Sequence, residues 1–412
     1  MILPIIILLL IFLFIAVRQI GSIKLQIWQI MLGGAMIVLV TRQISFYDAL
    51  KAINLDVMLF LFGMFVVGRA LEKSGYLSQV SYKLFKRAKT VNQLLLLLLF
   101  GMGLLSAFLM NDTIAIIGTP VVLLLARKHN IPASVLLLAL AFAITIGSSM
   151  SPIGNPQNLL IALQGNIGNL FATFFRFLIV PTIISLLLCF VILKIMYKKQ
   201  FRNRLLNHSQ EPIQNHQLAV LSKISLSLLI ILILAKIGIV FLHLNRDFRV
   251  TYIALIAALP IILFSSERKE ILKEIDWPTL IFFAAMFVVM ESVWQTGFFQ
   301  QIMKTANVSI VSVPVIFGIS VVLSQFISNV PLVALYLPIL THAGATIKEM
   351  MALAAGSTLA GNLLILGAAS NVIIIQNAEK RGETITFIEF AKVGIPVTIL
   401  TGAVYLGYLY LI

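Results

Sequence analysis

The sequence predicts an all-α polytopic membrane protein. We expect about ten transmembrane helices and two re-entrant hairpins in two inverted repeats, with discontinuous helices at the membrane midplane. Three observations predict this fold: the composition, the lengths of the apolar stretches and an ordered internal repeat. Of the 412 residues, 60% are apolar and 11% are charged, whereas soluble domains average about 45–50% and about 25%. Too few polar residues remain to cover a water-facing surface, so the composition excludes a soluble enzyme and a disordered or fibrous chain.

Several stretches have the pattern of plain membrane spans, each of which needs about 20 apolar residues. The first of them lacks a basic leading region and a small-residue cleavage site, so we expect a retained helix rather than a signal peptide. The expected spans are 1–17, 25–41, 54–71, 171–197, 221–243, 248–265, 279–294 and 392–411.

Two further apolar stretches are each hinged on a short polar motif. Each is expected to form either a re-entrant hairpin or a pair of short full spans, and in both cases the chain returns to its starting side. Residues 93–126 hinge on Met110-Asn111-Asp112-Thr113, and residues 312–341 hinge on Ser328-Asn329-Val330-Pro331.

Two long apolar stretches, 133–165 and 349–378, are interrupted near their middles by helix-breaking residues. As straight helices at about 1.5 Å per residue they would be about 45–50 Å long, against a hydrocarbon core of about 30 Å. We therefore expect both helices to break near the membrane midplane, at 151–158 and at 367–371.

The net charge of +15 arises from 30 Lys and Arg against 15 Asp and Glu. If the loop 72–92 is cytoplasmic, 22 of the 30 basic residues fall on the cytoplasmic side. This asymmetry follows the positive-inside rule, and it favours ten spans with both termini outside the cytoplasm. Nucleic-acid binding thereby loses its support. One cysteine and five scattered histidines exclude disulfides, a cysteine metal site and a zinc protease.

An ordered set of matches divides the chain into two repeats, 1–197 and 221–412, joined by a polar cytoplasmic linker at 198–220. Each repeat contains five expected spans and one hairpin. Because the first repeat crosses the membrane an odd number of times, the second repeat begins on the opposite side and has the inverted orientation. Such repeats with paired discontinuous helices are typical of secondary transporters. Met64-Phe65-Val66-Val67 and Gly75 match Met286-Phe287-Val288-Val289 and Gly297; Asn111 and Pro120 match Asn329 and Pro338; Ile153-Gly154 and Asn158 match Leu366-Gly367 and Asn371.

The four breaks combine two kinds of binding group at membrane depth. Half-helix N-termini carry roughly +0.5 charge and favour an anion, while unwound carbonyls with Asn and Ser oxygens can coordinate a small cation. The alternative is a purely structural role, in which these residues are helix caps or small residues at helix interfaces. The candidate binding residues are Asn111, Asp112, Thr113, Gly154, Asn155, Gln157, Asn158, Ser328, Asn329, Gly367, Ser370 and Asn371; Na⁺ is expected at Asn111, Asp112, Asn158, Ser328, Asn329 and Asn371.

Asp112 differs from the other candidates because it is ionisable. Only Asp112 and Glu291 among the acidic residues lie well inside apolar stretches, and a carboxylate at that depth indicates function by default. At the hairpin tip, Asp112 could bind Na⁺ or take up a proton. It could also cap the helix expected at 112–126, and the two roles are compatible.

These motifs resemble the ion transporter superfamily, in the group of arsenite permeases, sodium/proton antiporters, divalent-anion/sodium symporters and citrate-transporter-like proteins. The symporters carry Ser-Asn-Thr at both hairpin tips, and both tips here depart from that pattern. The Asn111-Asp112 pair is similar to arsenite permeases, and the run from Asn329 to Ala334 is similar to the antiporters, with Ser328 where they have Asp. The run 153–158 resembles the citrate and divalent-anion branch. The resemblance implies a scaffold half and a transport half that moves like an elevator, often in homodimers.

The residues and the resemblance together predict a secondary active transporter in the plasma membrane, the inner membrane of a bacterium. It is expected to move a small anion or oxyanion, coupled to Na⁺ or H⁺, and to need no other cofactor. Its expected partners are the anion, the coupling cation, the lipid bilayer and a second copy of the chain. Arsenite efflux and Na⁺/H⁺ antiport are the alternatives within the superfamily, and an ion channel is a remote one. An intramembrane enzyme is disfavoured because the apolar stretches carry no paired carboxylates and no Ser/His set.

Overall fold

The computed structural model describes residues 3–17, 19–20, 23–165, 167, 169–200, 206, 212–241, 249–298, 301 and 311–412. Almost all of its regular structure is α-helical, as predicted; one two-stranded antiparallel ribbon pairs β1 (Gln19–Ile20) with β2 (Ile23–Lys24). Helices dominate because a helix pairs its own backbone amides and carbonyls, which hydrocarbon cannot solvate.

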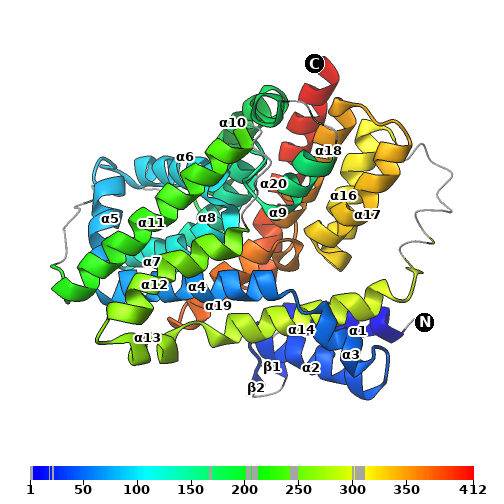
Figure 1. Ribbon diagram of the computed structural model, residues 1–412. Coiled ribbons are helices and arrows are strands. Elements are labelled where there is room, and N and C mark those ends of the chain that lie inside the picture. Colours follow the sequence, from blue (N-terminus) through cyan, green and yellow to red (C-terminus); the bar gives the residue numbers. More distant parts are fainter. Residues whose placement is uncertain are drawn as a thin grey trace.

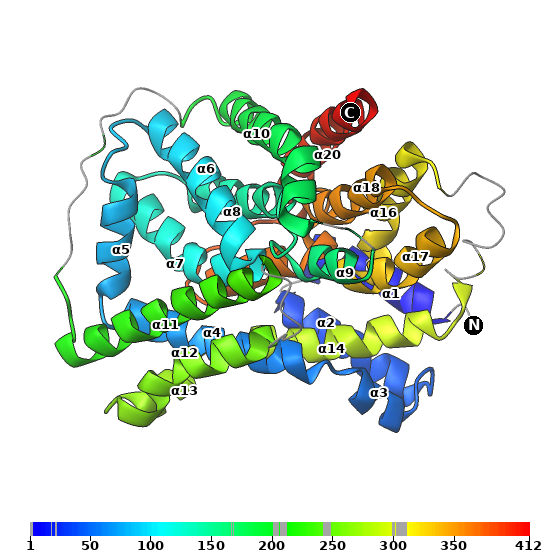
Figure 2. The same cartoon turned by 45° about the horizontal axis from the view of Figure 1, so that its top comes forward.

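The helices pack into two groups that lie against each other (Figures 1 and 2). We call the first group the frame, in which α4 packs on α12 and α14 packs on α2. The short helix α5 (Tyr76–Phe85) follows the frame helix α4 and leads toward the second group. The frame consists of α1 (Leu3–Val17), α2 (Ile27–Val40), α3 (Phe46–Ala52), α4 (Leu55–Lys73), α11 (His216–Phe241), α12 (Val250–Phe264), α13 (Arg268–Glu274) and α14 (Trp277–Trp294).

We call the second group the hairpin group, because it holds both hinged stretches and both interrupted ones. Its main contacts are α6 with α8, α16 with α18, α10 with α20, and α7 with α8 and α19. It consists of α6 (Val91–Leu109), α7 (Asn111–His129), α8 (Ala133–Ser148), α9 (Pro156–Gln164), α10 (Leu170–Met196), α16 (Val313–Ile327), α17 (Asn329–His342), α18 (Ile347–Leu359), α19 (Ala369–Glu379) and α20 (Phe387–Leu411), with two 3₁₀ turns, η1 (Ala360–Asn362) and η2 (Ile365–Gly367).

The described part of the chain contains five helices that are long and apolar enough to cross a membrane: α6, α10, α11, α14 and α20. The pair α3–α4, bent by 51°, would make a sixth. Other apolar helices, such as α1 and α2, have 10–17 residues, and at about 1.5 Å per residue they are shorter than the hydrocarbon core. The molecule is therefore a helical protein with several apolar spans.

Three details differ from the sequence-based expectation. The short helices α3, α5 and α13 were not predicted, since seven to ten residues give too weak a periodicity. The helix α11 begins at His216, inside the expected linker 198–220. The second interruption begins at Ala360, where α18 gives way to η1 and η2, earlier than the expected break at 367–371. That early break is stabilised by side chains from elsewhere in the fold, which are described below.

Several segments that were assigned to the cytoplasm come together at one end of the molecule. Backbone N–H groups of Gln214 and Asn215 donate to Ser74 O at 3.0 and 3.4 Å. At the same end, Arg381 forms an ion pair with Glu72, and Arg127 donates to the carbonyl of Arg381. The loops near 74, 127, 215 and 381 therefore share one face of the protein.

Candidate functional site

The tip of the first hairpin contacts the first helix break and the helix that follows the second one. The helix α7 begins at Asn111, whose backbone N–H donates to Gly154 O at 2.9 Å. Its side-chain Nδ2 lies 3.5 Å from Ser370 Oγ, in the first turn of α19. We call residues 149–155 the first break and residues 360–368 the second break. Asn111 thus joins a hairpin tip to the first break and to the helix that follows the second break.

Asp112 lies beside Asn111 in the first turn of α7, and its side chain is half-buried. The prediction that Asp112 caps this helix is wrong. The cap position is Met110, and the backbone N–H of Asp112 donates to Asn111 Oδ1 at 2.9 Å. Among the described residues, no donor and no cation contacts the Asp112 carboxylate. The carboxylate is therefore available to a proton or a cation.

The polar side chains of the first break are hydrogen-bonded to one another. Asn158 Nδ2 donates to the carbonyls of Ser148, Ser149 and Ser151 at 3.1–3.3 Å, and Asn158 Oδ1 accepts from Thr358 Oγ1 at 3.2 Å. Asn155 Oδ1 caps α9 through Asn158 N. These two asparagines hold the unwound turn together, and Thr358 ties the turn to α18.

A buried cluster of three hydroxyls supports the first break from behind. Tyr405 Oη lies 2.5 Å from Ser149 Oγ and 2.7 Å from Thr182 Oγ1, and all three residues are fully buried. Thr182 and Ser149 already donate their protons to the carbonyls of Leu178 and Ile146. Tyr405 is therefore the donor in this cluster, and its single proton is shared between the hydroxyl oxygens of Ser149 and Thr182. It links α20 and α10 to the residue whose carbonyl accepts from Asn158.

Replacing Tyr405 with phenylalanine is expected to weaken substrate binding without unfolding the protein. The change removes the one proton that two buried hydroxyl oxygens share, at a cost of about 1–3 kcal/mol, and frees the turn that orients Asn158. The measurement is the KM for transport together with the thermal unfolding midpoint. The matched control is Tyr408→Phe on the same helix, whose exposed hydroxyl contacts only Arg176 O, at 3.4 Å. An unchanged KM in Tyr405→Phe would contradict a positioning role.

The second break, in contrast, leaves buried polar atoms without partners. Asn371 Nδ2 donates to Gly361 O at 2.6 Å, and Gln325 Nε2 donates to Ala360 O at 2.9 Å. These two bonds satisfy the carbonyls where α18 unwinds, which explains why the break begins early. Within the described residues, the oxygens Asn371 Oδ1, Gln325 Oε1, Asn362 Oδ1 and Asn329 Oδ1 are buried and accept no hydrogen bond.

These orphan oxygens belong to one region of the hairpin group. Gln325 lies four residues before Asn329, at the tip of the second hairpin, and a Cβ added at Gly367 would lie 2.7 Å from Gln325 Oε1. The second break also contacts α8, because a Cβ at Gly361 would meet Thr145 Cγ2 at 3.2 Å. Buried acceptors are normally satisfied, so a cluster of four favours a ligand that supplies positive charge or donors.

The two hairpin tips share an unusual backbone conformation. Met110 has φ 65° and ψ 144°, and Ser328, 218 residues later, has φ 66° and ψ 159°. This region is almost restricted to glycine and costs of order 1–3 kcal/mol per residue. Such strain persists only where the surroundings impose it.

Replacing Met110 or Ser328 with glycine is expected to raise the thermal unfolding midpoint, because the relieved strain exceeds the added entropy of the unfolded chain, about 0.5–1 kcal/mol. The measurement is thermal unfolding of the purified variants in detergent. Asn130→Gly is the control, since Asn130 has φ 51° and ψ 43°, a conformation that asparagine tolerates. A lower midpoint in both tip variants would show that the tips are not strained.

The remaining predicted residues lie in the same places without forming side-chain bonds of their own. Thr113 and Gln157 are buried in α7 and α9. Ser328 precedes α17 but does not cap it. Gly154 has no room for a side chain, because a Cβ there would overlap the carbonyl of Ser148. The structure therefore brings together the candidate residues of the first hairpin and of both breaks. Ser328 and Asn329, at the tip of the second hairpin, follow Gln325 closely in the sequence.

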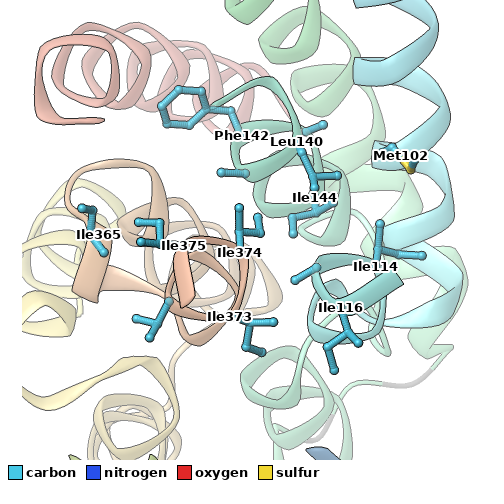
Figure 3. Close-up of a cluster of buried hydrophobic side chains, with 14 of the residues drawn as sticks. Met102, Ile114, Ile116, Leu140, Phe142, Ile144, Ile365, Ile373, Ile374 and Ile375 are labelled. Carbon is cyan, nitrogen blue, oxygen red and sulfur yellow. The ribbon is translucent and has the colours of Figure 1, made fainter. Parts of the chain in front are cut away.

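Apolar side chains seal the region next to the site. Figure 3 shows Ile373 and Ile374 of α19 facing Ile116 of α7 and Ile144 of α8, and these side chains are 0–1% exposed. In the low dielectric of such an environment, charges and dipoles interact more strongly than in water.

Four residues were missed by the sequence analysis: Gln325, Asn362, Thr358 and Tyr405. Gln325 and Asn362 carry a signal, since each is a lone amide in an expected apolar stretch. Thr358 and Tyr405 carry none that a sequence would reveal, because their partners are about 200 or more residues away. In the described part of the chain, no Lys, Arg or His bonds to any of the twelve predicted residues, and no cluster of three His, Cys, Asp or Glu could hold a metal.

Comparisons with known proteins find several that are similar to this chain. A 46 kDa membrane protein of Mycobacterium leprae is 28% identical over 407 residues that cover 92% of each chain. The silicon efflux transporter LSI3 of rice, Oryza sativa subsp. japonica, is 27% identical over 444 residues, 90% of each chain. The crystal structure of the YdaH transporter of Alcanivorax borkumensis is 17% identical and superposes with a TM-score of 0.48, over 99% of this chain and 96% of that one.

A family comparison is more decisive. The family described as citrate transporter matches residues 9–349, which include the first hairpin, the first break and the second hairpin. The resemblance to the ion transporter superfamily is thereby confirmed, as is the expectation of a transporter rather than an enzyme. The chain belongs to the citrate transporter family of membrane transporters.

Proposed function

We propose that this chain is a secondary active transporter that moves a small anion or oxyanion across the plasma membrane, coupled to Na⁺ or H⁺. The observation that carries the proposal is the contrast between the two breaks. The first break is internally hydrogen-bonded, whereas four buried oxygens of the second break and of α16, α17 and α19 accept no hydrogen bond from the described residues. Those oxygens suit a small cation such as Na⁺, whose ligands at discontinuous helices are carbonyl and side-chain oxygens.

Asp112 supplies the reason for coupling. Its carboxylate lies at the N-terminus of α7, where the helix dipole otherwise favours an anion, and no cationic side chain offsets it. An anion would be repelled until a proton or Na⁺ neutralises Asp112. Cation and anion would therefore bind together, which is the physical requirement for co-transport.

Repeated structural details support two inverted repeats with ten spans. Asn54 and Asp276 cap α4 and α14 at an offset of 222 residues, and Gly75 and Gly297 have positive φ at the same offset. Met110 and Ser328 correspond at 218. The loops near 74, 127, 215 and 381 lie at one end, as a shared cytoplasmic side requires. In this arrangement both termini face outside and a second copy of the chain is a natural partner.

Na⁺/H⁺ antiport is the second candidate, and the bare Asp112 carboxylate favours it. A site with one carboxylate, several neutral oxygens and no basic side chain would suit cations alone. The silicon efflux relative instead favours an oxyanion or its uncharged acid as cargo.

The test uses purified protein in liposomes. Currents are recorded on adding dicarboxylates, citrate, sulfate or arsenite, with and without Na⁺ and at two pH values, and uptake of uncharged silicic and arsenous acid is followed directly. An anion-evoked current that requires Na⁺ or a pH gradient supports the proposal, whereas uptake of only the uncharged acids would contradict an anionic cargo. Sodium-driven proton movement with no response to any cargo would overturn it in favour of antiport.

A further inference from the structure

We propose that a cluster of ion pairs between α19, α4 and α13 is a latch that holds the hairpin group in one position against the frame. The inference concerns the position of the hairpin group relative to the frame, so it does not depend on the identity of the substrate or of the coupling ion. The latch comprises Arg69, Glu72, Lys73, Glu270, Glu274, Lys380 and Arg381.

The centre of the latch is Glu72, at the end of frame helix α4. Arg381, which follows α19 of the hairpin group, donates from Nε to Glu72 Oε1 at 2.9 Å and from Nη2 to Glu72 Oε2 at 2.6 Å. Arg69 Nη1 donates to the same Oε2 at 2.8 Å. This two-pronged geometry is the strong form of an ion pair. The Glu72 carboxylate therefore binds two guanidinium groups, one from the frame and one from the hairpin group.

The frame side of the latch is itself braced. Arg69 donates from Nε and Nη2 to Glu274 Oε2 at 3.0 and 2.8 Å. These bonds hold the pKa of Glu274 below its ordinary value, so Glu274 is ionised at neutral pH. Lys73 forms an ion pair with Glu270 at 2.5 Å. The ends of α4 and α13 are thus one charged platform.

Lys380 adds a second attachment from the hairpin group. Its Nζ donates to the carbonyls of Glu274 and Ile275, the latter at 2.7 Å. These carbonyls lie at the end of α13 and in its connection to α14. Lys380 and Arg381, which follow α19, therefore bind two different segments of the frame. On the other side, Arg381 Nη1 donates to Asn377 O at 2.8 Å, which fixes the guanidinium to α19.

Next to the latch, α4 and α7 make apolar contacts. Gly68 of α4 faces α7 so closely that a Cβ would lie 3.2 Å from Ile116 Cγ2. Phe65, Gly68, Ile116 and Pro120 form the apolar part of a small pocket whose other lining residues include Arg69, Glu274, Lys380 and Arg381 of the latch. Apolar contacts of this kind are non-directional, so they do not fix one relative position of the two helices. Hydrogen-bonded ion pairs are directional. The latch is therefore the element that selects one position of α19 relative to α4.

The central ion pair of the latch, between Arg381 and Glu72, is half-shielded from solvent, which distinguishes it from an ordinary surface pair. The side chains of Arg381 and Glu72 are 18% and 28% exposed. The frame carries a matched control in Arg249–Asp56, which joins the two frame segments at the start of α12 and α4, with side chains 67% and 47% exposed. An exposed pair inside one group should not influence the position of the other group.

The test measures the distance between the groups with spin labels in nanodiscs, independently of transport. Labels are attached to cysteines at Lys269 on α13 and Ile388 on α20, both exposed, after replacement of the buried Cys189 with alanine. The variants are Glu72→Gln, Arg381→Gln and both together, with Asp56→Asn as the control.

We expect one main distance in the unaltered protein and in Asp56→Asn. In Glu72→Gln and Arg381→Gln, the ratio of a second distance to the first should rise at least tenfold, equivalent to about 1.4 kcal/mol. The double variant should shift no further than the larger single shift, because both changes break the same contact. Unchanged distances in the two single variants would overturn the latch, even if their unfolding midpoints fell.

Milder variants keep the test decisive if the neutralised proteins do not fold. Arg381→Lys retains the charge but loses the two-pronged geometry, and Lys380→Gln removes the second attachment at an exposed position. Each is expected to shift the distance ratio in the same direction by a smaller factor. If both leave the distribution unchanged, the proposal is wrong.

Discussion

Replacing Asp112 with asparagine is expected to abolish the dependence of transport on its coupling cation. The substitution keeps the shape of the side chain but removes the charge that a proton or Na⁺ must neutralise. In coupled systems one ligand raises the affinity for another by about 5–150-fold, and that factor should fall to about one. The measurement is the initial rate of uptake into proteoliposomes as a function of Na⁺ concentration and of pH.

The control for Asp112→Asn is Asp56→Asn, which also removes one carboxylate but lies exposed at the start of α4 and pairs with Arg249. It should leave the cation dependence unchanged. If Asp112→Asn also transported with the original dependence on both cations, Asp112 would have no part in coupling.

The second large effect is expected from Gln325→Met, which is nearly isosteric. It removes the orphan oxygen Oε1 and the donor that satisfies Ala360 O. The loss of one ligand oxygen and the release of the unwound turn should lower the affinity for the coupling cation at least tenfold, about 1.4 kcal/mol. The measurement is the cation concentration that half-saturates transport.

Gln376→Met is the matched control for Gln325→Met. Gln376 is a similarly buried glutamine in the second half of α19, a helix that begins only after the second break. It should keep the half-saturating cation concentration within about twofold of the original. An equal loss in both variants would mean that buried glutamines support the fold and not the cation site.

The general position of the site could be predicted from the sequence because hydrocarbon restricts the backbone so severely. Asn111, Gly154 and Asn371 stand out as polar or helix-breaking residues in stretches that are otherwise apolar. Unwound backbone at that depth must lie in protein or line a cavity, so the breaks were expected to meet. The contacts of Asn111 with Gly154 and Ser370 agree with that expectation.

The start of the second break could not be predicted in the same way. Gly361 and Asn362 are tolerated in membrane helices, and the chain unwinds there because Gln325 and Asn371 satisfy the freed carbonyls of Ala360 and Gly361. The support of the first break by Tyr405 was hidden for the same reason, since Ser149 lies 256 residues away.

The charged residues around α4 and α19 were interpreted only as indicators of topology. Their count predicts which loops share a side, but it carries no information on pairing. Arg381 pairs with Glu72, and Lys380 donates to the carbonyl of Ile275. Both contacts depend on the packing of α19 between α7 and the frame. Pairing of this kind requires the tertiary structure.

The central claim is that the coupling cation and the cargo bind together at the hairpin tips and helix breaks. The most direct test is the affinity of the purified protein for the anion that evokes a current, measured by calorimetry over a range of Na⁺ concentrations and pH values. We predict that one of the two cations strengthens anion binding by at least tenfold, and that Gln325→Met and Asp112→Asn lose this effect. Anion binding that is independent of both cations, in the unaltered protein, would contradict the claim.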